Sequence, residues 1–469
     1  MKITIPVLDT RTGVRSEFLG LGFEKLDRDL FDPAKAYPFL PATGVSWIRL
    51  QSGWQRTERE KGVYDFAWLD KIVDSLVGLG LKPWMCLCYG NALYGGGAEK
   101  VFGAVGVPPI ATEEQRRAWR AYVTATVAHF RGRVAAWEVW NEPDGQWCWK
   151  HGPSGTEYGR FVIETAAAAR AADPEAKIVA GSMCMWVDTP WFHEVVDTGA
   201  LDDIWGFTYH QYTDDERSSI EKAQMLEAML RPRNPDIRII QGESGSQSRP
   251  DGNGALRDQA WTPRKQARQL LRHAVADLLA GVEFSSYFSC LDMVEALNGA
   301  TGDLGSILDY GYFGVLGAEF GPDGRATGTY SPKPSYHALA HLASILRGAP
   351  RRVGAPVQFC ADPAPHLGWG VREPAGRELV FGMLELAGGA RALAYWNPTP
   401  LHTVEYNGTA TVVWRSVEKA PLLADPLTGT VEKLPEACVE HLAPGVLKLH
   451  RIPLRDTPLF LLDGTPWKE

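Results

Sequence analysis

The sequence has no basic run, no long apolar segment and no leader-like start. Its net charge is −8 at pH 7, which argues against nucleic acid or an anionic membrane surface as a partner. No window approaches the roughly 18 consecutive apolar residues of a membrane-spanning helix, and MKITIPVLDT lacks the apolar core of a signal peptide. These absences predict a cytoplasmic protein, although a chain from which a leader had been removed would read the same.

Motifs for metal and cofactor chemistry are missing as well. The seven cysteines are odd in number, and Cys86 and Cys88 lack the spacing of zinc ligands, so we expect reduced, structural thiols. There is no Gly-x-Ser-x-Gly elbow and no Gly-Lys-Ser/Thr phosphate loop. His337 and His341 have i, i+4 spacing, but no carboxylate follows at ligand spacing, and we expect them to pack within a helix. The sequence therefore predicts neither a metal nor a cofactor.

What the sequence does contain is a regular alternation of β-rich apolar runs with helical stretches. Eight such runs begin near Phe18, Val45, Lys82, Val134, Ala176, Ile204, Ile237 and Val282. Helix signals fall between them: Thr112 and Gln115 form a capping box, and Thr262-Pro263 is an N-cap followed by proline. Near-continuous hydrophobicity is typical of strands buried on both faces. Eight strand–helix units predict a (β/α)₈ TIM barrel over residues 1–348.

The pattern changes after Pro350. Long helical periods end, and short alternating runs such as RALAYWN, TATVVWR and VLKLHRI follow, separated by Gly, Pro and Asn. This pattern predicts an antiparallel β-sandwich domain over residues 349–469. The alternating KITIPV segment within residues 1–15 is a candidate additional strand of that sandwich.

Two of the eight predicted strands end on a glutamate. Glu142 ends the fourth run in VAAWEVWNEP, and Glu243 ends the seventh in IRIIQGESG. Because barrel enzymes carry their chemistry at the carboxyl ends of strands, both side chains are expected at one mouth. A carboxyl pair across a cavity is what cleavage of a glycosidic bond requires, and Asn141 is placed to bind a sugar hydroxyl. The alternative is that each glutamate is an ordinary solvated loop residue, but strands four and seven of eight favour the pair.

The motif WEVWNEPD resembles the acid/base motif of clan A retaining glycoside hydrolases, the four/seven superfamily, and most closely glycoside hydrolase family 39. The resemblance implies that Glu142 is the general acid/base and Glu243 the nucleophile. It further implies that Tyr212, in His210-Gln211-Tyr212 after strand six, supports the nucleophile, and that Arg49 in WIRL anchors it. His210 matches a substrate-site histidine of the same segment.

The resemblance covers most of residues 17–345, including the second strand–helix unit from Trp54 to Asp70, and loosely the sandwich. Two departures stand out. QGESG replaces the commoner Thr-Glu-x at strand seven, and strand eight has Tyr287-Phe288 where the family often has Tyr-Trp. The second departure removes an indole from the sugar-binding floor and leaves the sugar in doubt.

Further candidate contacts follow the predicted strands. Four tryptophans follow strands two, four and five: Trp54, Trp147, Trp149 and Trp186. They either stack on sugar faces or pack the loops on the barrel, and Trp147 is the leading candidate for stacking because it is close to Glu142. Glu24 and Asn91, near the ends of strands one and three, either contact sugar hydroxyls or are solvated.

The sequence thus predicts a retaining β-glycosidase that needs no cofactor, with a carboxyl separation of about 5–5.5 Å. The segment from Gly95 to Pro109 could wall off one side of the mouth, which favours a pocket and exo action on a glycoside or oligosaccharide. Two alternatives stay open: an endo-acting glycanase of the same clan, and an inactive barrel that only binds carbohydrate. The sequence indicates neither the sugar (xylose, glucose, galactose, arabinose or a uronic acid) nor the oligomeric state, nor whether the sandwich binds carbohydrate.

Overall fold

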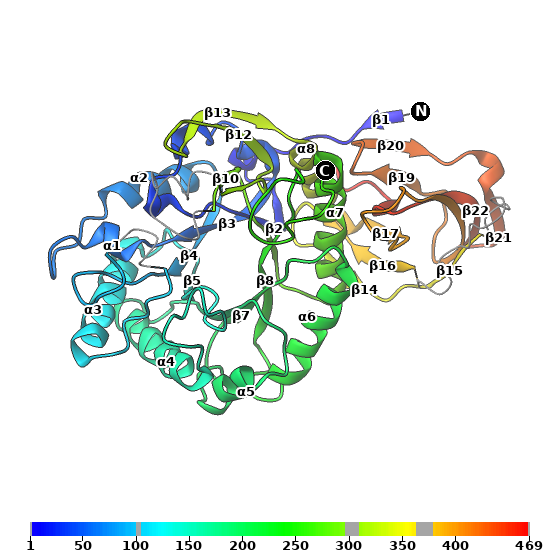
Figure 1. The fold of residues 1–469 in the computed structure, drawn as a ribbon. Coiled ribbons are helices and arrows are strands. Elements are labelled where there is room, and N and C mark those ends of the chain that lie inside the picture. Colours follow the sequence, from blue (N-terminus) through cyan, green and yellow to red (C-terminus); the bar gives the residue numbers. More distant parts are fainter. Residues whose placement is uncertain (1, 100–104, 296–308, 363–378, 468–469) are drawn as a thin grey trace.

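A computed structural model describes residues 2–99, 105–295, 309–362 and 379–467. Its larger part is a closed barrel of eight parallel strands (Figure 1). The barrel strands are β2 (Ser16–Gly22), β3 (Val45–Gln51), β4 (Lys82–Leu87), β5 (Ala136–Val139), β6 (Ile178–Met183), β7 (Gly206–His210), β8 (Arg238–Ser244) and β9 (Ser285–Tyr287). All eight predicted runs are therefore barrel strands, and the predicted fold class is confirmed.

Helices surround the barrel. They are α1 (Trp54–Thr57), α2 (Ala67–Gly78), α3 (Glu113–Phe130), α4 (Gly155–Ala172), α5 (Pro190–Asp197), α6 (Glu216–Leu230), α7 (Pro263–Ala280) and α8 (Pro334–Ile345). The capping box of Thr112 and Gln115 opens α3, and Thr262 caps α7, so both predicted helix starts are confirmed. Gly281 ends α7 in the left-handed conformation that glycine adopts without a Cβ clash.

Two short hairpins lie between β9 and α8. They pair β10 (Met293–Val294) with β11 (Tyr310–Gly311), and β12 (Leu316–Phe320) with β13 (Ala326–Pro332). Part of the segment from Gly95 to Pro109, expected to wall off the mouth, lies outside the described residues.

The C-terminal part consists of two antiparallel sheets that enclose their own core. The seven-stranded sheet has the order β1 (Lys2–Thr4), β20 (Thr430–Lys433), β19 (Leu422–Asp425), β23 (Leu459–Asp463), β17 (Arg391–Trp396), β16 (Val380–Glu385) and β14 (Arg351–Val353). The four-stranded sheet has the order β15 (Val357–Ala361), β18 (Asn407–Arg415), β22 (Val446–Arg455) and β21 (Val439–Ala443). β1 brings the N-terminal residues to the edge of the larger sheet, while the division of the chain at residue 348 stays a prediction.

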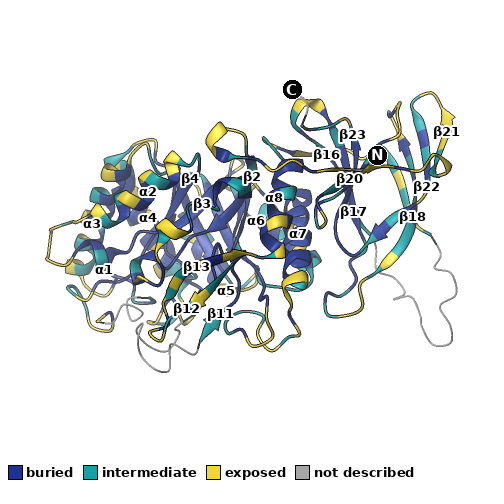
Figure 2. Cartoon of the chain, turned by 90° about the horizontal axis from the view of Figure 1, so that it is seen from above, coloured by how far each residue is buried: buried dark blue, intermediate teal, exposed yellow. Residues whose placement is uncertain are grey.

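Helix α7 lies between the barrel and the larger sheet, and this double cover explains why it is buried along most of its length (Figure 2). Its polar side chains find partners across the junction. Arg272 pairs with Glu216 of α6 at 2.6 Å and donates to the carbonyl of Thr399 at 2.7 Å. The indole of Trp396 donates to the same Glu216 at 2.7 Å. The sandwich is therefore fixed to the barrel by buried, paired polar groups as well as by apolar contacts.

The structure also tests three predictions that concern residues away from the two glutamates. All seven cysteines lie in the described part and are free thiols, as predicted. His341 packs in α8 with its Nδ1 3.0 Å from the carbonyl oxygen of Pro426, which confirms a structural role. Among the described residues, no helix has the length and hydrophobicity needed to cross a bilayer.

Candidate active site

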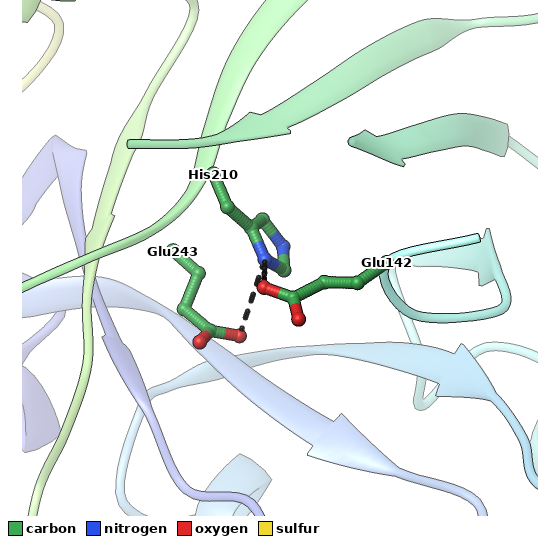
Figure 3. Close-up of side chains that lie close together, drawn as sticks. All are labelled: Glu142, His210 and Glu243. Atoms are coloured by element: carbon green, nitrogen blue, oxygen red, sulfur yellow. Dashed lines mark hydrogen bonds and ion pairs between the residues drawn. The ribbon is translucent and has the colours of Figure 1, made fainter. Parts of the chain in front are cut away.

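The two predicted carboxylates meet at the carboxyl end of the barrel. Glu243 lies in β8 and Glu142 follows β5, and Figure 3 shows both side chains pointing toward His210 at the end of β7. One oxygen of each carboxylate and one imidazole nitrogen lie within 4.8 Å of one another. The two glutamates singled out in the sequence therefore lie close together in the structure, and the His210 side chain lies between them.

The backbone around Glu142 is strained. Trp140 and Glu142 have φ values of +67° and +47°, which residues other than glycine rarely adopt. The N–H of Glu142 donates to the carbonyl of Ser182 in β6 at 3.1 Å, which holds this conformation. Strain of this kind concentrates at functional sites, and here it turns the carboxylate into the mouth.

Arg49 in β3 organises the floor of the site. Its buried guanidinium contacts five side chains: Glu243 at 2.7 Å, Glu138 at 2.8 Å, Asn141 at 2.8 Å, Glu24 at 3.2 Å and Ser182 at 3.4 Å. Three carboxylates around one arginine raise the pKa of Arg49 although burial alone would lower it. The predicted contact between Arg49 and Glu243 is therefore present. The side-chain oxygen of Asn141 accepts a hydrogen bond from Arg49.

Glu243 is held in its ionised form. Burial would raise its pKa, but the positive charges of His210 and Arg49 outweigh burial and lower the pKa below the ordinary value of 4.5. The hydroxyl of Tyr212 donates to the other oxygen of Glu243 and favours the same state. A carboxylate that is ionised, only 13% exposed and oriented on both oxygens has the properties of a nucleophile.

Both oxygens of Glu142 accept hydrogen bonds. Oε1 lies 2.9 Å from Nδ1 of His210, and the indole N–H of Trp147 donates to Oε2. Burial would lower the pKa of His210, but the negative charges of Glu243 and Glu142 outweigh it and raise the pKa above 6.5. The other imidazole nitrogen lies 3.0 Å from the hydroxyl of Ser182, which fixes the ring.

Glu24 is buried close to the site, so the solvated alternative is wrong, and a contact with a sugar hydroxyl stays a prediction. It is 2% exposed, and one of its oxygens contacts Arg49 while the other has no hydrogen-bond partner among the described residues. Burial, reinforced by the charge of Glu243 and only partly offset by Arg49, raises its pKa to about 7. Glu24 thus shares Arg49 with Glu243.

Trp54 and Trp149 do not stack on sugars. Both side chains are fully buried, and Trp54 is stacked on Tyr94 and on Tyr122 with ring centroids 5.4 Å apart in each pair. The prediction of a sugar contact is wrong for these two tryptophans because the surrounding aromatic rings cover them. Trp147 and Trp186 are 49% and 42% exposed, so stacking on a sugar stays a prediction for these two side chains.

Two further predicted contacts are also used within the protein. Tyr287 is 5% exposed, with its hydroxyl 3.4 Å from the backbone of Ser246, whereas Phe288 packs at 6.4 Å from the ring of Tyr212. Asn91 donates to the carbonyl of Glu58 at 2.9 Å and accepts from a loop N–H, so its amide anchors the loop. The hydroxyl of Tyr287 and the amide of Asn91 are thus both engaged in hydrogen bonds within the protein.

Three functional neighbours were missed from the sequence. Glu138 is fully buried in β5 and pairs with Arg49, Ser182 binds His210, and Lys25 pairs with Glu295 at 3.1 Å. The positive charge of Lys25 contributes to the lowered pKa of Glu243. A charged residue inside the apolar run AAWEVW was the available signal for Glu138, since an unpaired buried carboxylate is costly.

Glu142, His210 and Glu243 are also the group of described residues whose atoms come close enough to hold a metal ion. Arg49 already places a permanent positive charge 2.7 Å from Glu243. A second cation at this point would be repelled by the arginine. The positive charge of Arg49 therefore disfavours a metal ion at this cluster.

Comparisons with known proteins find similarity to glycoside hydrolases. Residues 45–241 match the family model described as glycosyl hydrolases family 39. A β-xylosidase of Geobacillus stearothermophilus is 31% identical over 133 residues, which are 26% of this chain and 25% of that protein. Endo-1,4-β-xylanase C of Phanerodontia chrysosporium is 33% identical over 132 residues, which are 27% of this chain and 30% of that protein. The matches thus span less than a third of either curated relative.

A solved structure extends the likeness to the whole fold. A family 39 glycoside hydrolase of Bacteroides cellulosilyticus superposes with a TM-score of 0.65 at 17% identity, over 98% of this chain and 83% of that chain. At this identity the likeness concerns the fold, in which a barrel is followed by a sandwich.

Proposed function

We propose that this chain, a clan A glycoside hydrolase most like family 39, cleaves β-linked glycosides by double displacement, with Glu243 as nucleophile and Glu142 as acid/base. One observation carries the proposal: Arg49 and Tyr212 bind Glu243, whose side chain is 13% exposed, and one oxygen of Glu142 lies within 4.8 Å of one oxygen of Glu243. A carboxylate kept ionised beside a second carboxyl group that can exchange protons is the pair that this reaction needs.

In the first step, an oxygen of Glu243 attacks the anomeric carbon and the glycosidic C–O bond breaks. Glu142 gives its proton to the departing oxygen, so the leaving group departs as an alcohol and a glycosyl ester of Glu243 forms. Glu142 must bind a proton for this step. His210, which already lies 2.9 Å from Glu142 and whose pKa is raised, can supply one.

In the second step, Glu142 removes a proton from water, and the resulting hydroxide attacks the anomeric carbon as the ester bond breaks. Each displacement inverts the anomeric centre, so the product retains the β configuration. The proximity of the carboxylate oxygens supports retention, because inverting enzymes separate their carboxyl groups by about 6.5–9.5 Å to leave room for water.

We further propose exo action on a β-xyloside as the first candidate, in line with the name of the Geobacillus relative. Endo action is the second candidate, and the similarity to an endo-xylanase favours it. Products decide between them: exo action releases a single sugar from the chain end, and endo action shortens the chain internally.

The test is hydrolysis of a panel of aryl β-glycosides by the wild type and by Glu243→Gln. The wild type is expected to release chromophore from at least one member, with the xyloside first, and the variant from none. If the wild type releases no chromophore from the whole panel, the proposed activity is wrong and a carbohydrate-binding barrel is favoured.

Replacing Tyr212 with phenylalanine is expected to lower kcat/KM by roughly 10–100-fold, the value of a hydrogen bond to a charged group. The loss of the hydroxyl weakens the stabilisation of ionised Glu243, so its pKa rises toward 4.5. The acidic limb of the pH profile of kcat/KM is therefore expected to move to higher pH, which steady-state rates measured across the acidic range will detect.

The matched control is Tyr209→Phe, the same change on β7, where the hydroxyl faces Asp277 at 3.4 Å instead of the site. This control is expected to leave the acidic limb in place. An unshifted limb in Tyr212→Phe would contradict the role of the hydroxyl.

A further inference from the structure

A cavity of about 340 Å³ lies at the mouth of the barrel, among the loops that follow β2, β3 and β4. Its charged lining residues are four arginines and two aspartates: Arg28, Arg56, Arg59, Arg325, Asp27 and Asp29. The lining therefore has an excess of two positive charges on a chain whose net charge is −8. Such a local reversal of sign indicates an anionic ligand.

Tyr89 places this cavity next to the catalytic pair. It lines the cavity, and its hydroxyl accepts a hydrogen bond from Gln51 at 3.1 Å. Gln51 and Arg49 lie two residues apart on β3 and so point to the same side of the strand. The ring of Tyr89 also packs edge-on against Trp140 at 5.4 Å. Tyr89 and Gln51 thus connect the cavity to β3 at a position two residues from Arg49, which holds Glu243.

The arginines differ in how firmly they are held. Arg56 is fixed, because it donates to the carbonyl of Leu26 at 2.6 Å and lies over the ring of Trp68 at 4.4 Å. Arg325 is 48% exposed and lies 3.5 Å from Asp29. Arg59 is exposed and has no hydrogen bond or ion pair to any of the described residues. Arg59 and Arg325 therefore keep donors available for a ligand.

We propose that this cavity binds the carboxylate of an acidic sugar, a uronic acid unit or branch beside the sugar that is cleaved. The guanidinium fork of arginine matches a carboxylate with two parallel hydrogen bonds, and Arg59 and Arg325 supply that fork. The volume lies near the lower end of small-ligand pockets, about 300 Å³, and suits one sugar unit. This inference rests on the proposed function, because it assigns a second position on the same substrate.

The test measures binding rather than turnover. Glu243→Gln is titrated calorimetrically with a xylo-oligosaccharide that carries one glucuronic acid branch, and with the same compound after reduction of its carboxylate to an alcohol. The acidic compound is expected to bind about 10-fold or more tightly, the effect of charge-assisted hydrogen bonds, and the preference is expected to shrink at high salt.

The variant Arg59→Ala/Arg325→Ala, made in the Glu243→Gln background, is expected to lose the preference. Arg117→Ala, which removes an exposed arginine on α3, is expected to keep it. Thermal unfolding will establish that the double variant is folded.

Three results would overturn the proposal: no measurable binding of the acidic compound, equal affinity for the two compounds, or a preference that survives the double variant. Competition by inorganic sulfate at the same concentration would also overturn it, because it would indicate a simple anion site. Failure of the proposed function is seen separately, as absence of aryl β-glycoside hydrolysis by the wild type.

Discussion

Replacing Glu243 with alanine is expected to reduce hydrolysis of an aryl β-glycoside by about 10⁴-fold or more, because the proposed nucleophile is lost. The alanine leaves space on that face of the sugar. Sodium azide is therefore expected to enter, attack the anomeric carbon directly and restore turnover. Since this is a single displacement, the product is the α-glycosyl azide, which NMR identifies.

Two variants make this result specific. Glu142→Ala with azide is expected to give the β-glycosyl azide, because azide then attacks the ester of Glu243 in place of water. Glu175→Ala, which removes an exposed carboxylate before β6 at the far end of the barrel, is expected to keep full activity. The same azide anomer from both active-site variants would contradict the assignment of roles.

Replacing Arg49 with methionine is expected to lower the free energy of unfolding at neutral pH by about 3–5 kcal/mol. The change leaves buried Glu138, together with Glu24 and Glu243, without their shared cation. Denaturant unfolding compares this variant with Arg117→Met, an exposed change expected to cost less than about 0.5 kcal/mol.

The pH dependence of that loss has a definite sign. The folded-state pKa of Glu243 lies below its ordinary value of 4.5, so its contribution to stability is fully present above pH 4.5. It disappears as the pH falls through the lowered folded-state pKa, because protonated Glu243 no longer needs Arg49. The difference between wild type and Arg49→Met is therefore expected to narrow at acidic pH. A loss below 1 kcal/mol at neutral pH would show that the cluster does not depend on Arg49.

The barrel and its two acids could be predicted because their signals are local. Eight apolar runs require burial on both faces, which a parallel barrel supplies. Glu142 and Glu243 each end such a run, so their convergence follows from topology alone.

The burial of individual tryptophan side chains could not be predicted from local sequence. Trp54 and Trp147 both follow barrel strands, yet Trp54 is buried against Tyr94 and Tyr122 while Trp147 is half exposed at Glu142. Which tryptophan is covered depends on rings that are distant in the sequence.

The network around Arg49 also depends on tertiary structure. Glu24, Glu138 and Glu243 come from three different strands or strand ends and meet at one guanidinium group. The sequence predicted the contact of Arg49 with Glu243, and Glu24 only as a sugar contact, so it did not show that the carboxylates share a single positive charge. The buried charge of Glu138 becomes understandable only when Arg49 is beside it.

We propose that Glu243 and Glu142 act on one sugar in two successive displacements. Proton NMR of the first product that the wild type forms from an aryl β-glycoside, recorded before mutarotation, distinguishes this mechanism from a single displacement. The β anomer is expected to form first. Initial formation of the α anomer would mean a single inverting displacement and would rule out the double displacement.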